Sequence, residues 1–164
     1  MRKLIMLLAV VVALGVVGCG SSHKSTSASS SGTTVHLAKT KFVIHAGLAF
    51  GAFHRWIYKP YKAGELNHPL RHKLVFVKAL AAGLFVIHEV RLARTDAAHS
   101  RLLSRVVVPL AALGTSVALI HAALSHHHVD SSDINSANGD IGKAHAASSA
   151  AGQPVSETTS GAPI

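Results

Sequence analysis

The chain has 164 residues, which allows one small domain. Hydrophobic residues make up 49% of it and aromatic residues only 5%, a profile that favours helices rich in small aliphatic side chains and disfavours a β-sandwich. The formal charge of +9 is concentrated in the middle, because residues 39–105 hold 12 Lys and Arg against three acidic residues, whereas residues 126–164 hold one Lys against four.

The amino-terminal residues have the three parts of an export signal. Two cations at positions 2 and 3 precede an uninterrupted apolar run from Leu4 to Leu14, which has the length of a signal-peptide hydrophobic region. The run leads into Val16, Val17, Gly18 and Cys19, and Cys19 is the only cysteine of the chain. This order resembles the lipobox signal peptide of bacterial lipoproteins, over residues 1–19 only.

The resemblance implies a signal peptide over residues 1–18, a diacylglycerol on the Cys19 sulfur, and acyl chains such as palmitate at the new terminus. Two acyl chains anchor a protein stably where one would be marginal, so we expect it on the outer side of the cytoplasmic membrane. An uncleaved transmembrane anchor is the alternative. Residues 19–35 are mostly Ser, Gly and Thr without an apolar face, which predicts a flexible tether.

The body of residues 36–125 contains three apolar segments, expected to be helices at about 38–58, 73–92 and 105–125. We therefore predict an all-α fold, a helical hairpin or three-helix bundle embedded in the membrane, with disordered ends. In the first segment, Gly47 and Gly51 form a Gly-x-x-x-Gly pair, which permits close helix packing. That segment ends in Trp and Tyr mixed with cations, which is typical of a membrane–water boundary.

The third segment is the most apolar. Residues 106–125 carry no charge and have the length needed to cross a bilayer. A seam of small residues with helical spacing is expected to pack against another helix, and it consists of Ala111, Thr115, Ala118 and Ala122. After this segment, residues 126–164 are rich in Ser, Ala, Gly and Asp, and we predict a disordered tail.

If all three segments cross the membrane, an external Cys19 places the basic loop of residues 59–72 on the cytoplasmic side, in agreement with the positive-inside rule. The next loop, with four arginines at positions 91–105, is then external and also basic, which conflicts with that rule. Two arrangements therefore stay open. One is a multi-pass membrane protein, and the other is a peripheral bundle that its lipid tethers to the outer leaflet.

The 13 histidines are the main candidates for chemistry. His45, His88 and His121 each lie inside an apolar segment, and His54 ends the first. Histidines from neighbouring helices hold haem in b-type membrane cytochromes, although the expected depths of His45 and His88 differ by about 7 Å. Hydrogen bonds between helices are the simpler interpretation. The run His126, His127 and His128 could collect divalent metal weakly.

No Gly-x-Ser-x-Gly, His-Glu-x-x-His or phosphate-binding glycine loop is present in the sequence, so we do not predict an enzyme. The predicted function is a non-enzymatic accessory or scaffold lipoprotein of the bacterial envelope. Its expected partners are membrane lipid with anionic headgroups and a membrane protein, with no nucleic acid and no cofactor. The alternative is a haem- or metal-binding membrane protein that uses His45, His54, His88 and His121.

Overall fold

A computed structural model describes residues 30–164, with side chains described from residue 36. The predicted signal peptide, Cys19 and most of the predicted tether lie outside the described residues.

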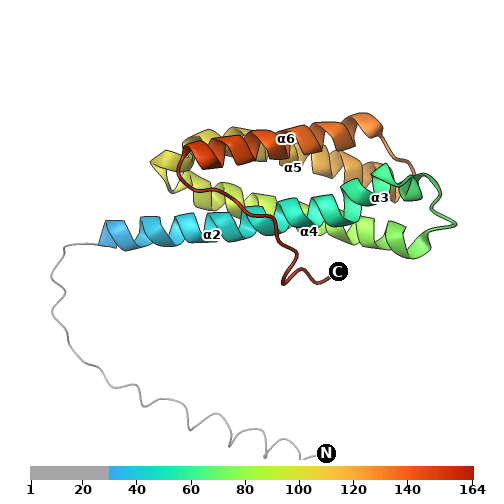
Figure 1. Cartoon of the computed structure of the whole chain (residues 1–164), viewed down its shortest axis with the longest axis horizontal. Coiled ribbons are helices and arrows are strands. Elements are labelled where there is room, and N and C mark those ends of the chain that lie inside the picture. Colours follow the sequence, from blue (N-terminus) through green and yellow to red (C-terminus); the bar gives the residue numbers. More distant parts are fainter. Residues whose placement is uncertain (1–29) are drawn as a thin grey trace, which may run out of the picture.

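Four long helices account for most of the described chain (Figure 1). They are α2 (Ser30–Phe53), α4 (Lys73–Ala98), α5 (Ser104–Ser125) and α6 (Ser131–Ala150). Short helical turns join them, namely η2 (His54–Tyr58), α3 (Lys59–Lys62), η3 (Glu65–Asn67) and η4 (Arg101–Leu103). Residues 30–164 contain no strand, so the predicted all-α class is confirmed, as a bundle of four helices instead of three.

Each long helix packs on the next one in the chain, α2 on α4, α4 on α5, and α5 on α6. Figure 1 shows α6 with α5 above α2 with α4, and the chain end crossing in front of α2. The helices meet through apolar positions that recur every three or four residues, because this spacing returns to one helical face. On α5 the buried face consists of Val106, Leu110, Leu113, Val117, Ile120 and Leu124.

The predicted disordered tail is wrong for residues 131–150, which form α6. Asp130 caps this helix, since its Oδ1 accepts a hydrogen bond from the backbone N–H of Ser132 at 2.8 Å. The residues that α6 buries again have helical spacing, and they are Ile134, Ala137, Asp140, Ile141, Ala144 and Ser148. Only two of them are large, so α6 is stabilised by packing against α5 and not by its own composition.

The small-residue seam of α5 does not lie between helices of this bundle, which corrects the packing expected for it. Thr115, Ala118 and Ala122 are exposed and Ala111 is half-buried. The larger aliphatic side chains of α5 occupy the interior instead, because their burial removes more apolar surface from water. Among the described helices, the stretch Arg101–Ser125 is the one long and apolar enough to cross a membrane.

The glycine pair of α2 contacts the C-terminal segment (residues 151–164), not another helix. The backbone N–H of Thr158 donates to the carbonyl of Gly47 at 3.1 Å. A Cβ atom built on Gly47 would lie 2.5 Å from the carbonyl oxygen of Ser156, and one built on Gly51 would overlap the backbone of Thr158. The close approach predicted for this motif therefore exists, but its partner is an extended chain.

Candidate functional site

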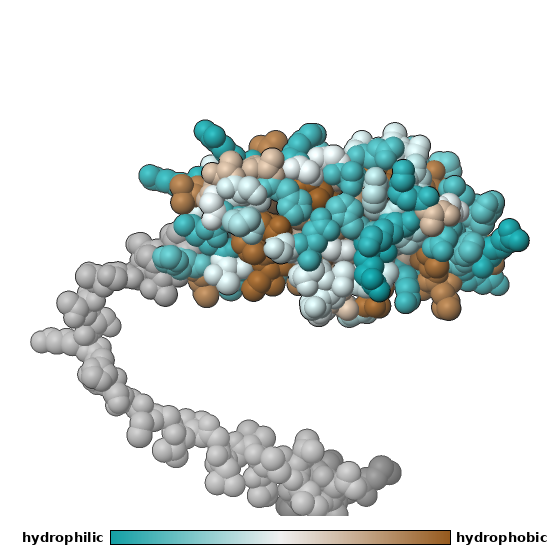
Figure 2. All heavy atoms as spheres, in the orientation of Figure 1, coloured by the Kyte–Doolittle hydropathy of each residue, from teal (hydrophilic) through white to brown (hydrophobic). Residues whose placement is uncertain are grey.

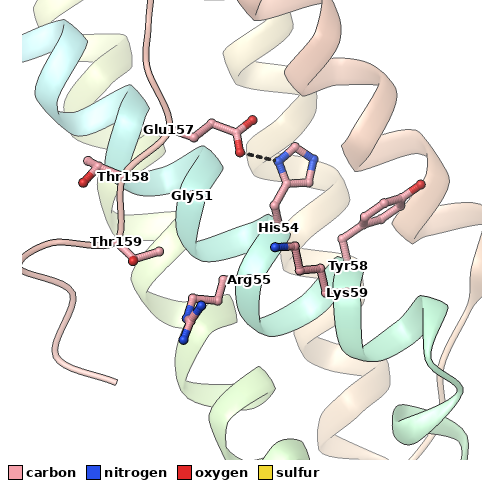
Figure 3. A pocket seen from close by; sticks show the side chains of 8 residues that line it. All are labelled: Gly51, His54, Arg55, Tyr58, Lys59, Glu157, Thr158 and Thr159. Atoms are coloured by element: carbon pink, nitrogen blue, oxygen red, sulfur yellow. Dashed lines mark hydrogen bonds and ion pairs between the residues drawn. The ribbon is translucent and has the colours of Figure 1, made fainter.

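The end of α2 continues into a π-helical turn, η2, without a break in the helix. The backbone N–H of Lys59 bonds to the carbonyl of His54, five residues earlier, which is the π-helical pattern. Such turns are uncommon and occur frequently at functional sites, because they shift the side chains that follow around the helix. In Figure 3, His54 points toward Glu157 of the C-terminal segment, whereas Arg55 points away from it.

His54 joins three parts of the chain through its two ring nitrogens. Nδ1 lies 2.8 Å from Oε2 of Glu157, and Nε2 lies 2.8 Å from Oδ1 of Asn138 on α6. The other oxygen of Glu157, Oε1, lies 3.4 Å from Nε2 of His145, also on α6. Both ring nitrogens of His54 thus lie within hydrogen-bond distance of oxygen atoms, so this one side chain joins the end of α2 to α6 and to the C-terminal segment.

An open pocket of 560 Å³ adjoins this cluster (Figure 3). It is lined by Gly51, His54, Arg55, Tyr58, Lys59, Glu157, Thr158 and Thr159. The lining combines two permanent cations, two hydroxyl-bearing threonines and one carboxylate, so its polar groups suit a small polar or anionic molecule. Among residues 30–164, no group of three His, Cys, Asp or Glu side chains is arranged to hold a metal ion.

His45, a second candidate histidine, lies on α2 and contacts two acidic side chains of α4. Nδ1 of His45 lies 2.6 Å from Oε2 of Glu89, and Nε2 lies 3.8 Å from Oδ2 of Asp96. Glu89 is buried, so His45 supplies the partner that a buried carboxylate needs. This contact links α2 and α4 and turns both acidic side chains of α4 toward α2.

The remaining two candidate haem ligands have other surroundings. His88 is exposed on α4. His121 packs against Gly83 of α4, where an added Cβ atom would lie 3.2 Å from the His121 ring, and its buried Nδ1 has no hydrogen-bond partner among the described residues. His45, His54, His88 and His121 therefore occupy four different settings.

The histidine run at the end of α5 lies in an ordered turn. His126, His127 and His128 are exposed, and His127 has a positive φ of 59°, which is uncommon for a residue other than glycine. The His127 ring stacks on Phe76 with 5.4 Å between ring centroids. Residues 126–128 thus close the turn between α5 and α6, and the His127 ring packs on Phe76.

Sequence reasoning missed Asn138, His145 and Glu157, because all three fall in the segment predicted to be disordered. A signal for α6 was present, since Asp130 is a favoured capping residue and Ile134 and Ile141 lie seven residues apart on one helical face. Nothing local in the sequence connects Glu157 with His54, which is 103 residues away. Comparison of the chain with protein-family models, with curated proteins and with solved structures finds no match.

Proposed function

We propose that this chain is a lipid-anchored accessory protein of the bacterial envelope, which Cys19 holds on the outer surface of the cytoplasmic membrane. The signal-peptide pattern of residues 1–19 supports the anchor. The bundle itself is held at the surface and does not cross the bilayer. It works as a binding or scaffold module and not as an enzyme.

The observation that carries the surface location is the packing of polar α6 along α5. Oγ of Ser116, near the middle of α5, donates to Oδ2 of Asp140 on α6 at 3.3 Å. Lys143 pairs with the same carboxylate at 2.9 Å, and the Lys143 side chain is 72% exposed. If α5 spanned a bilayer, α6 would bring these charges to its centre, where each costs about 2.5–3.5 kcal/mol. The apolar length of α5 is better explained by its role in the bundle core.

The side of the molecule that carries the C-terminal segment supports a role in binding water-soluble partners. Figure 2 shows that apolar areas on this side are interrupted by hydrophilic side chains. The pocket beside His54 opens here, and its permanent cations are Arg55 and Lys59. A tethered bundle with this side outward presents the pocket to the compartment outside the membrane.

The anchor is tested by labelling cells that express the full chain with a palmitate analogue. Label should appear on the wild-type protein and be absent from Cys19→Ala.

The location of the bundle is tested with Cys19→Ala carrying a cleavable signal peptide of the non-lipoprotein type. Alkaline carbonate should release this variant from membranes. An unlabelled wild-type chain contradicts the anchor, and retention of the variant in the carbonate pellet supports the multi-pass arrangement instead.

A further inference from the structure

The outer face of α4 and the turn before it carries a row of exposed aliphatic side chains. Leu70, Leu74, Val77 and Leu84 are 81%, 78%, 60% and 59% exposed. Within α4 their spacing of three and seven residues puts them on one helical face. An apolar row on the outside of a helix favours contact with another apolar phase. In Figure 1 much of α4 lies behind α2, whereas the C-terminal segment crosses in front of α2.

The charges of α4 are sorted between its two sides. Its four basic residues, Lys73, Lys78, Arg91 and Arg94, are all exposed. Its two acidic residues, Glu89 and Asp96, both face His45 of α2. The exposed surface of α4 is therefore apolar in its first half, from Leu74 to Leu84, with Lys73 and Lys78 beside the apolar residues. Its second half is polar and positive, with Arg91 and Arg94 exposed. This sorting favours an anionic partner.

We propose that the outer face of α4 docks along the surface of a bilayer that contains anionic phospholipid. Leu74, Val77 and Leu84 enter the boundary between headgroups and acyl chains, and the flanking cations reach lipid phosphates. A helix with an apolar stripe and cations beside it lies in the interface in this way. The inference rests on the proposed function in one respect, because the acyl anchor keeps α4 close to the membrane.

The test uses the full acylated chain, in which an introduced cysteine is the only free thiol. Val77→Cys and the matched control Asn135→Cys, exposed on α6, are each labelled with an environment-sensitive fluorophore. The proteins are bound to phosphatidylcholine vesicles with or without phosphatidylglycerol, and spin-labelled lipids serve as quenchers. With phosphatidylglycerol, the probe at position 77 should shift to the blue and be quenched, and the probe at position 135 should do neither. Circular dichroism checks that both variants stay helical.

Charge variants measure the electrostatic part of docking. Lys73→Gln and Lys78→Gln should each lower the ratio of docked to undocked bundles about fivefold on the anionic vesicles, because each cation near such a surface contributes to binding. Equal quenching at position 77 on neutral and anionic vesicles contradicts the role given to the cations.

The outcomes separate this inference from the proposed anchor. An acylated, vesicle-bound chain whose position 77 stays in water overturns docking and leaves the anchor intact. A chain without acyl groups whose position 77 is quenched overturns the anchor and supports docking. A probe that becomes buried only in native membranes, and not in lipid vesicles, overturns the lipid assignment in favour of a membrane-protein partner.

Discussion

The Nδ1 atom of His45 lies 2.6 Å from Oε2 of Glu89, and the Glu89 side chain is only 9% exposed. A carboxylate that is so far removed from water must keep a partner, or it loses both hydration and hydrogen bonding. The two residues come from neighbouring helices, α2 and α4. The contact therefore helps to fix the packing of α2 on α4, and it also gives the buried Glu89 carboxylate a partner.

Replacing His45 with Ala should lower the free energy of unfolding by about 1–3 kcal/mol, because it leaves the Glu89 carboxylate buried without its partner. Urea unfolding followed by circular dichroism measures the change. The exposed His88 is the matched control, and His88→Ala should change stability by less than about 0.5 kcal/mol. In the double variant His45→Ala/Glu89→Gln, part of the loss should be recovered, since no charge is then left buried. Full additivity of the two single changes would show that the pair does not interact.

Replacing Gly51 with Ala should displace the C-terminal segment from α2, because the new Cβ atom would overlap the backbone of Thr158. The expected destabilisation is about 1–3 kcal/mol, and the Thr158 amide should exchange its hydrogen faster. Gly139 and Gly142 of α6 are good controls, since a Cβ atom on either meets nothing within 4 Å. Alanine at these helical positions should stabilise the protein by up to about 1 kcal/mol. Unchanged exchange at Thr158 in Gly51→Ala would argue against the observed path of the segment.

The existence of α6 as a packed helix is tested by Ile134→Ala, since Ile134 is fully buried. Truncation of a buried Ile to Ala lowers stability by about 2–5 kcal/mol. Asn135 is its exposed neighbour on the same helix, and Asn135→Ala should have little effect. Thermal unfolding of the two variants gives the comparison. Equal melting temperatures for both would mean that residues 131–150 do not pack against α5.

The cap of α6 should make stability sensitive to acid. Hydrogen bonds from the side chain and backbone of Ser132 lower the pKa of the Asp130 carboxyl from its ordinary value of 3.8. A carboxyl whose pKa falls on folding stabilises the folded state above its unfolded pKa, and this contribution is lost as pH falls through the folded value. Asp130→Ala should therefore be less stable than wild type at neutral pH, and the difference should vanish well below pH 3.8.

Asp130→Asn is the control for the charge, because Asn caps helices about as well as Asp but does not titrate. Its stability should exceed that of the Ala variant at neutral pH and in acid alike. Melting temperatures of the three proteins across the acid range measure both effects. A constant difference between wild type and Asp130→Ala at every pH would contradict the role of the ionised carboxyl.

Three of the four long helices could be predicted from the sequence, because α2, α4 and α5 each contain a long apolar stretch. The residues at which these helices begin and end were harder to predict. Helix α4 continues to Ala98, beyond the expected end at residue 92, because Ala93 and Ala97 extend its buried face. Helix α6 was missed because only two of its buried residues, Ile134 and Ile141, are large and apolar, and its other buried residues are small or polar like those of a linker.

The site near His54 depended on contacts that no local pattern encodes. His54 was singled out as a residue at the end of an apolar segment, but its partners Asn138 and Glu157 lie in residues predicted to be disordered. The glycine pair was expected to allow close packing of another helix, and the backbone of residues 156–158 lies against it instead. The nature of the approaching chain could not be predicted, because Gly47 and Gly51 leave space for a helix or a strand equally well.

The path of the C-terminal segment has a consequence for the order in which the molecule can be completed. Glu157 follows His54 by 103 residues, yet Glu157 and Thr158 contact the first described helix and the turn after it. A nascent chain that already contains α2, α4 and α5 still lacks the backbone that fits against Gly47 and Gly51. The packing of α2 is therefore completed only after residues 156–158 have been synthesised, and chains truncated before them should be selectively recognised by proteases.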